Sequence, residues 1–201
     1  MSETKEHILK TSLVLFLQKS YRDVTMSEIV NKTGLSKGAF YHYFSSKEEL
    51  FKEIASMFFS MGMVDYSSFQ RDSFHSFYQD YVNFLSHSID DLNSLVSDPG
   101  LKSGTFNFFL IMFEAISRFP EFLETELTLH KEDIKMWEER IRIARQLGEI
   151  SSGSTDEEIA GLFLYCTDGV FIRYINSDKP LAYKEYLLSA FDTIYNNLKT
   201  K

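Results

Sequence analysis

The chain has 201 residues, of which 44% are hydrophobic and 25% are charged, which is typical of a globular protein with a sizeable core. Three prolines and nine glycines favour long helices over a turn-rich β fold, and a single cysteine, Cys166, excludes an intramolecular disulfide and a cysteine-rich zinc site. The net charge of −8 at pH 7 excludes a surface that is basic throughout.

The sequence contains no segment suited to crossing a membrane. The longest apolar run, Phe108 to Phe113, is far shorter than the ~18 residues that a membrane-spanning helix needs. The first residues, Met1 to His7, are polar and charged and lack the apolar core of a signal peptide. The lone cysteine fits a reducing compartment. We therefore expect a cytoplasmic protein with no membrane partner.

The first two predicted elements are helices. Apolar residues with three-and-four spacing from Thr4 to about Lys19 indicate an amphipathic helix. A second helix is expected after Thr25, because threonine is a good N-cap residue. This helix should end at Gly34, because glycine readily adopts the left-handed conformation found at helix C-termini.

Two more helices follow directly. Ser36 is a suitable N-cap for a short third helix, predicted from Lys37 to Phe44. Ser46 and Glu49 have the spacing of a capping box, in which a serine and a glutamate satisfy backbone N–H groups reciprocally. They predict the start of a fourth helix that runs to about residue 64.

The rest of the chain is also predicted to be helical. Prolines or glycines that interrupt the apolar spacing separate five further helices. No stretch of any length shows the alternation typical of strands, so the sequence predicts an all-α protein of about nine helices. The five later helices are expected from residue 74 to the interruption near residue 98, and over 106–117, 121–147, 156–175 and 183–198.

Charge is distributed unevenly along the chain. Residues 1–55 carry eight Lys and Arg against seven Asp and Glu, whereas residues 56–201 carry thirteen against twenty-two. Within the first part, Asn31 to Lys47 contains no acid. An acidic body would be repelled by DNA phosphates, so this window is the surface that they would tolerate, although a run of this length also occurs by chance.

The third predicted helix lies inside this acid-free window. At about 100° per residue, Phe40 and Phe44 fall together and form the inward face. Lys37 lies in the first turn, where the positive end of the helix suits a phosphate, and Lys47 flanks the same surface. The outward face holds two small residues and two hydrogen-bonding ones: Gly38, Ala39, Tyr41 and His42.

Three segments in this region share the spacing of a known signature. They are Thr25-Met26-Ser27-Glu28-Ile29-Val30, Thr33-Gly34-Leu35-Ser36-Lys37-Gly38-Ala39-Phe40-Tyr41-His42-Tyr43-Phe44, and Ser46-Lys47-Glu48-Glu49-Leu50. Together they closely resemble the N-terminal signature of the TetR family of transcriptional regulators, with two helices joined by a tight turn as in a helix-turn-helix. The resemblance covers about residues 5–54 and departs from the family at Val30, where alanine is commoner.

The resemblance implies a role for each matching residue. Gly38 and Ala39 would lie against base edges in the major groove of double-stranded DNA. Tyr43 could be either a core residue or a phosphate donor, and its place on the helix favours the core. The alternative for Tyr41 and His42 is a solvated helix face. The residues implied to contact the phosphate backbone are Thr25, Ser36, Lys37, Tyr41, His42 and Lys47.

The last two predicted helices suggest a homodimer. In the family that the head resembles, two such helices from each subunit form an apolar four-helix interface. The alternative is that both apolar stripes pack within their own subunit, but each helix is apolar on more than one side, which favours the dimer. The candidate interface residues are Leu162, Phe163, Cys166, Gly169, Val170, Leu187, Ala190, Phe191 and Ile194.

An aromatic-rich region in the middle of the chain suggests an apolar pocket for a small molecule of unknown identity. An aromatic stripe with helical spacing is more often plain core, so for any single residue the core interpretation is favoured. The candidate lining residues are Phe58, Met61, Phe77, Tyr81, Phe109, Met112, Phe113, Trp137 and Ile141, with Phe59 and Phe106 beside them.

These observations lead to one main functional hypothesis. The sequence indicates a ligand-responsive regulator, with a DNA-binding head over residues 1–50 and a ligand-binding and dimerisation body over residues 51–201. Two other classes of protein are less favoured by the sequence. A helical module that binds a protein instead of DNA is disfavoured by the acid-free face. An enzyme is disfavoured because the five histidines and Cys166 form no catalytic or metal-binding pattern, and we expect no cofactor.

Overall fold

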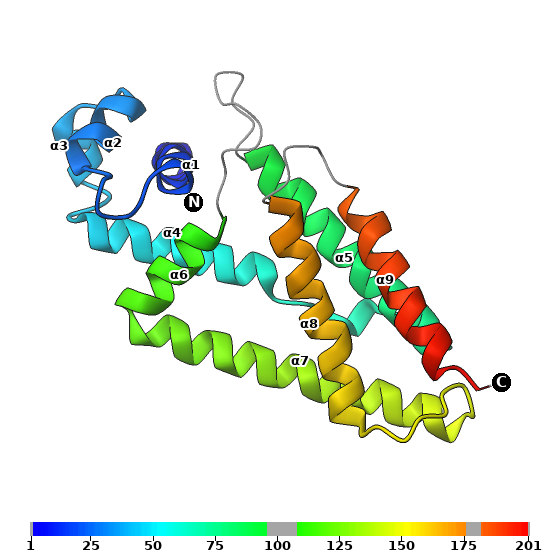
Figure 1. The fold of residues 1–201 in the computed structure, drawn as a ribbon. Coiled ribbons are helices and arrows are strands. Elements are labelled where there is room, and N and C mark those ends of the chain that lie inside the picture. The colour runs from blue at the N-terminus through cyan, green and yellow to red at the C-terminus, as the bar shows by residue number, and fades with distance from the viewer. Residues whose placement is uncertain (1, 96–107, 176–181, 201) are drawn as a thin grey trace. The chain divides into compact units, whose positions relative to one another are not determined.

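The protein is helical throughout the part that its structure describes. The computed structural model describes residues 2–95, 108–175 and 182–200. Within these residues the chain forms nine α-helices and no strand, so the predicted all-α fold is confirmed (Figure 1). The helices are α1 (Glu3–Gln18), α2 (Met26–Thr33), α3 (Lys37–Tyr41), α4 (Lys47–Gly62), α5 (Phe74–Leu95), α6 (Phe108–Arg118), α7 (Pro120–Gln146), α8 (Asp156–Ile175) and α9 (Tyr183–Leu198), with a 3-10 helix at Tyr66–Ser68.

The helix ends are set by local capping. Ser2, Thr25 and Ser36 each accept a hydrogen bond from a backbone N–H in the first turn of the helix that they precede. Gly34 and Gly148, which follow α2 and α7, adopt φ values of 68° and 73°. Because L side chains rarely adopt this conformation, the two glycines end their helices at low steric cost.

Two local details differ from the sequence prediction. The third helix ends at Tyr41, because Tyr43 N bonds the carbonyl of Phe40 at 3.0 Å in a tightened last turn. The capping box before α4 is displaced by one residue. Ser46 Oγ accepts from Glu49 N at 3.1 Å as predicted, but the Glu49 carboxylate accepts from the N–H of Ser45, at 2.8 Å.

The chain divides into two compact units, each with its own core. Unit 1 comprises residues 1–62 and 91–125, and unit 2 comprises residues 63–90 and 126–201. The sequence predicted a division between a DNA-binding head and a body at residues 50 and 51. The boundaries of the compact units lie elsewhere, and the functional division stays a prediction. In unit 1, α1 packs against α2, α4 and α6. Its core contains Phe16 and Phe51, whose rings meet edge to face at 4.9 Å.

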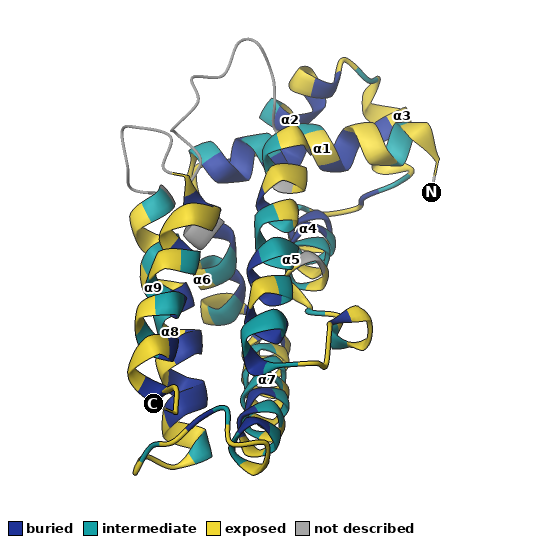
Figure 2. Ribbon diagram, turned by 90° about the vertical axis from the view of Figure 1, so that its right-hand side faces the viewer, coloured by how far each residue is buried: buried dark blue, intermediate teal, exposed yellow. Residues whose placement is uncertain are grey.

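Unit 2 is built around aromatic rings from α5, α7, α8 and α9. Trp137 on α7 is fully buried, with the rings of Phe77 and Phe163 each 5.1 Å from its own. Phe191 on α9 meets Phe163 edge to face at 4.8 Å. Buried residues therefore lie on the inward sides of these helices, while exposed residues follow their outer sides (Figure 2).

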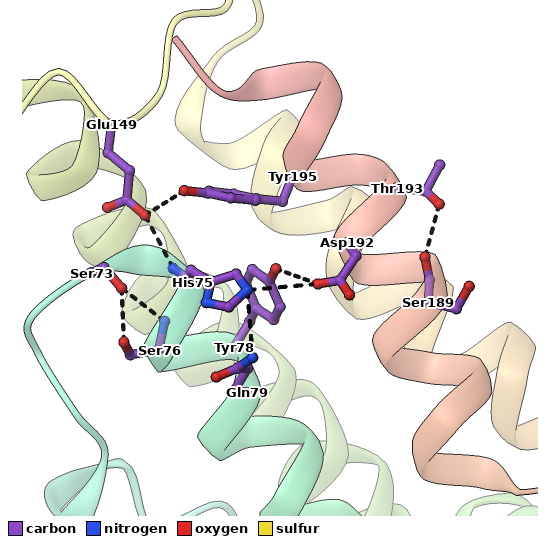
Figure 3. A network of polar contacts seen from close by, with 10 residues as sticks. All are labelled: Ser73, His75, Ser76, Tyr78, Gln79, Glu149, Ser189, Asp192, Thr193 and Tyr195. Carbon is purple, nitrogen blue, oxygen red and sulfur yellow. Dashed lines mark hydrogen bonds and ion pairs between the residues drawn. The ribbon is translucent and has the colours of Figure 1, made fainter. Parts of the chain in front are cut away.

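A polar network ties three segments of unit 2 together. The Glu149 carboxylate, just beyond α7, accepts hydrogen bonds from the backbone N–H of Phe74 (2.9 Å) and of His75 (3.2 Å) at the start of α5. It also accepts from the Tyr195 hydroxyl of α9 at 2.9 Å (Figure 3). Glu149 thus caps α5 from 75 residues away along the chain, and its negative charge suits the positive end of that helix.

The hydropathy of the helices bears on whether any of them could cross a membrane. Among the described residues, none of the helices combines the length and the apolar character that a bilayer crossing requires.

Candidate nucleic-acid interface

The turn between α2 and α3 is fixed by backbone caps on both sides. Thr25 Oγ1 accepts from Glu28 N at 3.1 Å, and Ser36 Oγ accepts from Ala39 N at 3.2 Å. Both residues are exposed. A hydroxyl that accepts a backbone hydrogen bond still has its own O–H to donate. Thr25 and Ser36 can therefore cap their helices and donate to an external acceptor at the same time.

The outward face of α3 is exposed as the sequence predicted. Phe40 and Phe44 are fully buried, whereas Tyr41 is 47% exposed. Lys37 makes no ion pair with any residue that the structure describes, so its ammonium group is available to an external anion. The exposed residues of this face are Lys37, Gly38, Ala39, Tyr41 and His42.

Gly38 leaves an open space on this face. Apart from the two neighbouring residues and the backbone of its own helix, a Cβ atom built at Gly38 would have no atom within 4 Å among the described residues. Packing within the fold therefore does not require glycine there, and the space is open to a partner that approaches from outside. This is the arrangement that close backbone approach to a groove floor needs.

The sequence left open whether Tyr43 is a core residue or a phosphate donor, and its position in the structure is intermediate. Its side chain is half-buried, and its ring meets that of His42 edge to face at 5.2 Å. The Tyr43 hydroxyl accepts a hydrogen bond from Ser2 Oγ at 3.2 Å, at the start of α1. The sequence prediction did not include Ser2, because no local pattern relates residue 2 to residue 43.

Lys47 has partners within the head, and its predicted contact with a phosphate stays a prediction. Its Nζ donates to the carbonyls of Tyr21 (2.8 Å) and Val24 (2.7 Å), and the carbonyl of Arg22 lies at 3.5 Å. Nζ also lies 4.4 Å from the centroid of the Tyr21 ring. Burial and, secondarily, the charge of Arg118 hold the pKa of Lys47 below its usual value. Through these contacts Lys47 holds the connection between α1 and α2.

The predicted pocket residues fall into both units. In unit 1, Phe58 and Met112 are half-buried and Phe113 is exposed. The side chains of Met61 and Phe109, and all of Phe106, lie outside the described residues. In unit 2 the four candidates are buried in the core and are at most 4% exposed. This agrees with the core interpretation, which the sequence favoured for any single residue. The four are Phe77, Tyr81, Trp137 and Ile141.

The residues of the predicted dimer interface differ in exposure, and the interface stays a prediction. Phe163, Leu187 and Phe191 are fully buried in the core of unit 2, so they pack within their own subunit. The apolar character of α8 on several sides did not reveal which side faces inward. Leu162 is 52% exposed and Gly169 is also exposed. The remaining candidates are half-buried: Cys166, Val170, Ala190 and Ile194.

Two exposed tyrosines near these residues were missed. Tyr165, 61% exposed, lies three residues after Leu162 on α8, and Tyr186 of α9 is 58% exposed. The spacing of three residues places Tyr165 on the same face as Leu162, which is the signal that would have found it.

Comparison with known proteins agrees with these features. The family described as "Bacterial regulatory proteins, tetR family" matches residues 8–54. The "Uncharacterized HTH-type transcriptional regulator YerO" of Bacillus subtilis is 40% identical over 72 residues, which cover 36% of this chain and 25% of YerO. The chain thus matches only about a quarter of this relative's length. YfiR of Bacillus subtilis, also described as an uncharacterized HTH-type regulator, is 26% identical over 188 residues, covering 89% of this chain and 87% of YfiR.

A third relative matches both in sequence and in fold. The "HTH-type transcriptional repressor NemR" of Escherichia coli is 44% identical over 46 residues, which cover 23% of each chain. The crystal structure of E. coli NemR in its reduced form matches with a TM-score of 0.63 and 17% identity, covering 100% of this chain and 99% of NemR. This family comprises regulatory proteins and not enzymes, in keeping with the sequence prediction. Residues 8–54 are thus similar to the tetR family of bacterial regulatory proteins, and the chain as a whole has the fold of the NemR crystal structure.

Proposed function

We propose that this protein is a dimeric transcriptional repressor that binds a near-palindromic operator and is released by a small apolar or amphipathic molecule. The observation that carries the proposal is the exposed, acid-free face of α3, with Lys37 at its start and an open space at Gly38. An acidic chain with a net charge of −8 repels phosphates elsewhere, so this face is where a duplex can be tolerated.

On this proposal, the residues of the head divide into two groups. Lys37, Tyr41 and His42, with the Thr25 and Ser36 hydroxyls, contact phosphates and fix the register of the protein on the duplex. Gly38 and Ala39 lie against base edges in the major groove. Because these two residues offer no long side chain, sequence preference depends on thymine methyl contacts and on DNA shape.

The proposed dimer forms through the exposed apolar face of α8 and α9. Leu162 and Tyr165 on α8 and Tyr186 on α9 form the accessible part of this face. A second copy of the same face would cover these side chains and remove their apolar surface from water. The two heads would then enter successive major-groove turns about 34–36 Å apart.

Repression and release complete the proposal. The repressor role is supported by analogy with NemR, whose name describes it as a repressor. A ligand in the body would change the position of α4, which is continuous with the head, and so lower the affinity for the operator. The proposed place of action is the cytoplasm. Equal head separation with and without a bound inducer would contradict this mechanism.

The experiment that tests DNA binding is a salt titration. Duplexes selected from random sequence by the purified protein serve as the ligand, and affinity is measured from low to moderate salt. Because each neutralised phosphate contributes to the salt slope, Lys37→Ala should reduce the slope of log K against log salt by about 1. Lys131→Ala, an exposed lysine of α7, is the matched control and should leave the slope unchanged. Salt-independent binding, or none at low salt, would refute the proposal.

A further inference from the structure

We propose that Arg118 of α6 is a positioning residue for the DNA-binding head and acts through the ring of Tyr21, in the connection between α1 and α2. This inference rests on the proposed function, because it names a residue outside the face of α3 on which the affinity for DNA depends. All of the residues involved belong to unit 1.

The first observation is that the Tyr21 ring contacts cations from two different helices. The central carbon of the Arg118 guanidinium lies 4.5 Å from the ring centroid, and Lys47 Nζ of α4 lies 4.4 Å from it. The face of an aromatic ring attracts cations, and the attraction is larger where the groups are partly removed from water. Tyr21 thus connects the end of α6 to the start of α4, although it belongs to neither helix.

The second observation is that the backbone of the same residue is bound at the start of the helix-turn-helix. Lys47 Nζ donates to the carbonyl of Tyr21 at 2.8 Å and to that of Val24 at 2.7 Å. Val24 directly precedes Thr25, the N-cap residue of α2, and Lys47 is the first residue of α4. A displacement of Tyr21 would therefore affect the start of α2 and the connection from α3 to α4 together.

The third observation is that the core of the head leaves part of the Tyr21 ring to Arg118. The ring is stacked with that of Phe16 at 5.9 Å and meets that of Phe51 edge to face at 4.8 Å. Both phenylalanines are buried, whereas Tyr21 is half-buried. Arg118 comes from α6, which packs against α1 and α4 but lies outside residues 1–50. It is therefore a contact through which a segment beyond the head reaches the connection between α1 and α2.

The charges around Tyr21 indicate that Arg118 does more than stabilise the fold. Burial lowers the pKa of Lys47, and the charge of Arg118 lowers it further, because the two cations repel each other. The Glu114 carboxylate accepts a hydrogen bond from Arg118 Nε and offsets part of this repulsion. Removal of Arg118 takes away a ring contact and a repulsion together. We therefore expect a small change in global stability and a larger loss of local order around Tyr21.

The alternative role for Arg118 is direct contact with DNA, because an exposed arginine can also bind a phosphate. The salt dependence of binding distinguishes the two roles. Loss of a phosphate contact reduces the slope of log K against log salt by about 1, as expected for Lys37→Ala. Loss of a positioning contact lowers the affinity by the same factor at every salt concentration and leaves the slope unchanged.

The first test measures the affinity of the full-length protein for duplexes that it selects from random sequence. Arg118→Ala should weaken binding by about threefold to tenfold at an unchanged salt slope. Arg118→Lys keeps a cation and should retain most of the affinity. Arg142→Ala, which removes the same charge from an exposed position of α7 in unit 2, should have no effect. Circular dichroism establishes that each variant is folded at the temperature of the measurement.

A double-mutant cycle tests whether Arg118 acts through Tyr21. Tyr21→Phe keeps the ring, so Arg118→Ala should weaken DNA binding in this background as much as in the wild type. Tyr21→Leu removes the ring, and Arg118→Ala should then cause no further loss. If Tyr21→Leu does not fold, the exchange measurement on Arg118→Ala and Arg118→Lys decides.

The second test uses amide hydrogen exchange in the protein without DNA. The N–H groups of Asp23 and Val24 donate to the carbonyl of Ser20 at 3.1 and 3.3 Å, so their exchange reports on opening of this connection. Arg118→Ala should increase the exchange rate over residues 20–24 by about threefold or more, and Arg118→Lys should change it less. Peptides from α8, which lies in unit 2, should exchange as in the wild type.

Four results would overturn the inference: unchanged DNA affinity in Arg118→Ala, a reduced salt slope, an equal effect of Arg118→Ala in Tyr21→Leu, or unchanged exchange over residues 20–24. The failure of each idea can be distinguished. A protein that binds no duplex refutes the proposed function, and the exchange measurement then still shows whether Arg118 orders the connection. A protein that binds duplexes equally well with and without Arg118 refutes this inference alone.

Discussion

Two lysines near α3 show how surroundings decide what a charged residue does. Lys37 is exposed without an ion pair among the described residues, whereas Lys47 holds the carbonyls of Tyr21 and Val24. The sequence does not distinguish them, because helical spacing places residues along a helix and does not reveal backbone carbonyls that approach from another segment. Lys47 therefore contributes to the stability of the head, whereas a contact of Lys37 with an external partner stays a prediction.

We therefore predict that Lys47→Met destabilises the protein by about 1–3 kcal/mol, because it leaves part-buried carbonyls without a donor. Urea unfolding followed by circular dichroism measures this difference. Lys37→Met removes the same charge from an exposed site and should change the free energy of unfolding by less than about 0.5 kcal/mol. Equal stability losses in both variants would show that the Lys47 contacts do not stabilise the head.

Substitutions at two glycines, Gly34 and Gly38, are expected to have different effects on stability and on DNA binding. Gly34 has φ of 68°, so Gly34→Ala should cost about 1–2 kcal/mol of stability through backbone strain. Gly38→Ala meets no atom within 4 Å, and we predict that it leaves the melting temperature unchanged. A methyl group there should weaken duplex binding by about 1–3 kcal/mol through overpacking at the groove floor. Full DNA affinity in Gly38→Ala would contradict the predicted close approach of α3.

Asp133 gives a pH-dependent prediction. Burial raises its pKa above the ordinary carboxyl value, so the folded state binds this proton more tightly than the unfolded state does. The resulting stability is fully present below about pH 4 and is lost as the pH rises through the raised pKa. Asp133→Asn lacks this loss, so its stability relative to the wild type should increase from pH 4 to pH 7.

Tyr66→Phe provides the complementary change. The Tyr66 hydroxyl lowers the pKa of Asp133, so its removal should extend the loss of stability to higher pH. Urea unfolding at several pH values measures both variants. A difference between Asp133→Asn and the wild type that does not depend on pH would show that Asp133 has an ordinary pKa.

At the scale of elements, the starts and ends of the helices could be predicted because capping is local. Thr25, Ser36 and Gly34 act within a few residues of their own positions, and the structure places them at the helix ends as expected. The cap of α5 could not be predicted, because its acceptor, Glu149, lies 75 residues away along the chain. Helical periodicity contains no information about contacts at that separation.

The inward side of α8 was equally hard to predict. Apolar residues surround much of this helix, so the pattern predicted a partner without showing which side it covers. The structure assigns Phe163 to the core and leaves Leu162 and Tyr165 exposed. The candidate DNA-binding face was more predictable, because the large apolar side chains at α3, Phe40 and Phe44, lie on one side.

The whole molecule is proposed to act as a dimer, and the exposed face of α8 gives the test. Leu162→Lys combined with Tyr165→Lys places two charges where a second copy would pack, so we predict a monomer by sedimentation velocity. Leu147→Lys, at an exposed leucine at the end of α7, should remain dimeric. A dimer that persists in the double variant would place the interface elsewhere.

We expect α3 to enter the major groove of DNA, and amide hydrogen exchange measures the resulting protection of this helix. Exchange is compared with and without a duplex selected from random sequence, at a salt concentration that saturates binding. We predict slower exchange over residues 36–42 when the duplex is bound, since bound DNA excludes water and restricts opening of this short helix. Unchanged exchange over residues 36–42, with protection confined to another part of the bound protein, would contradict it.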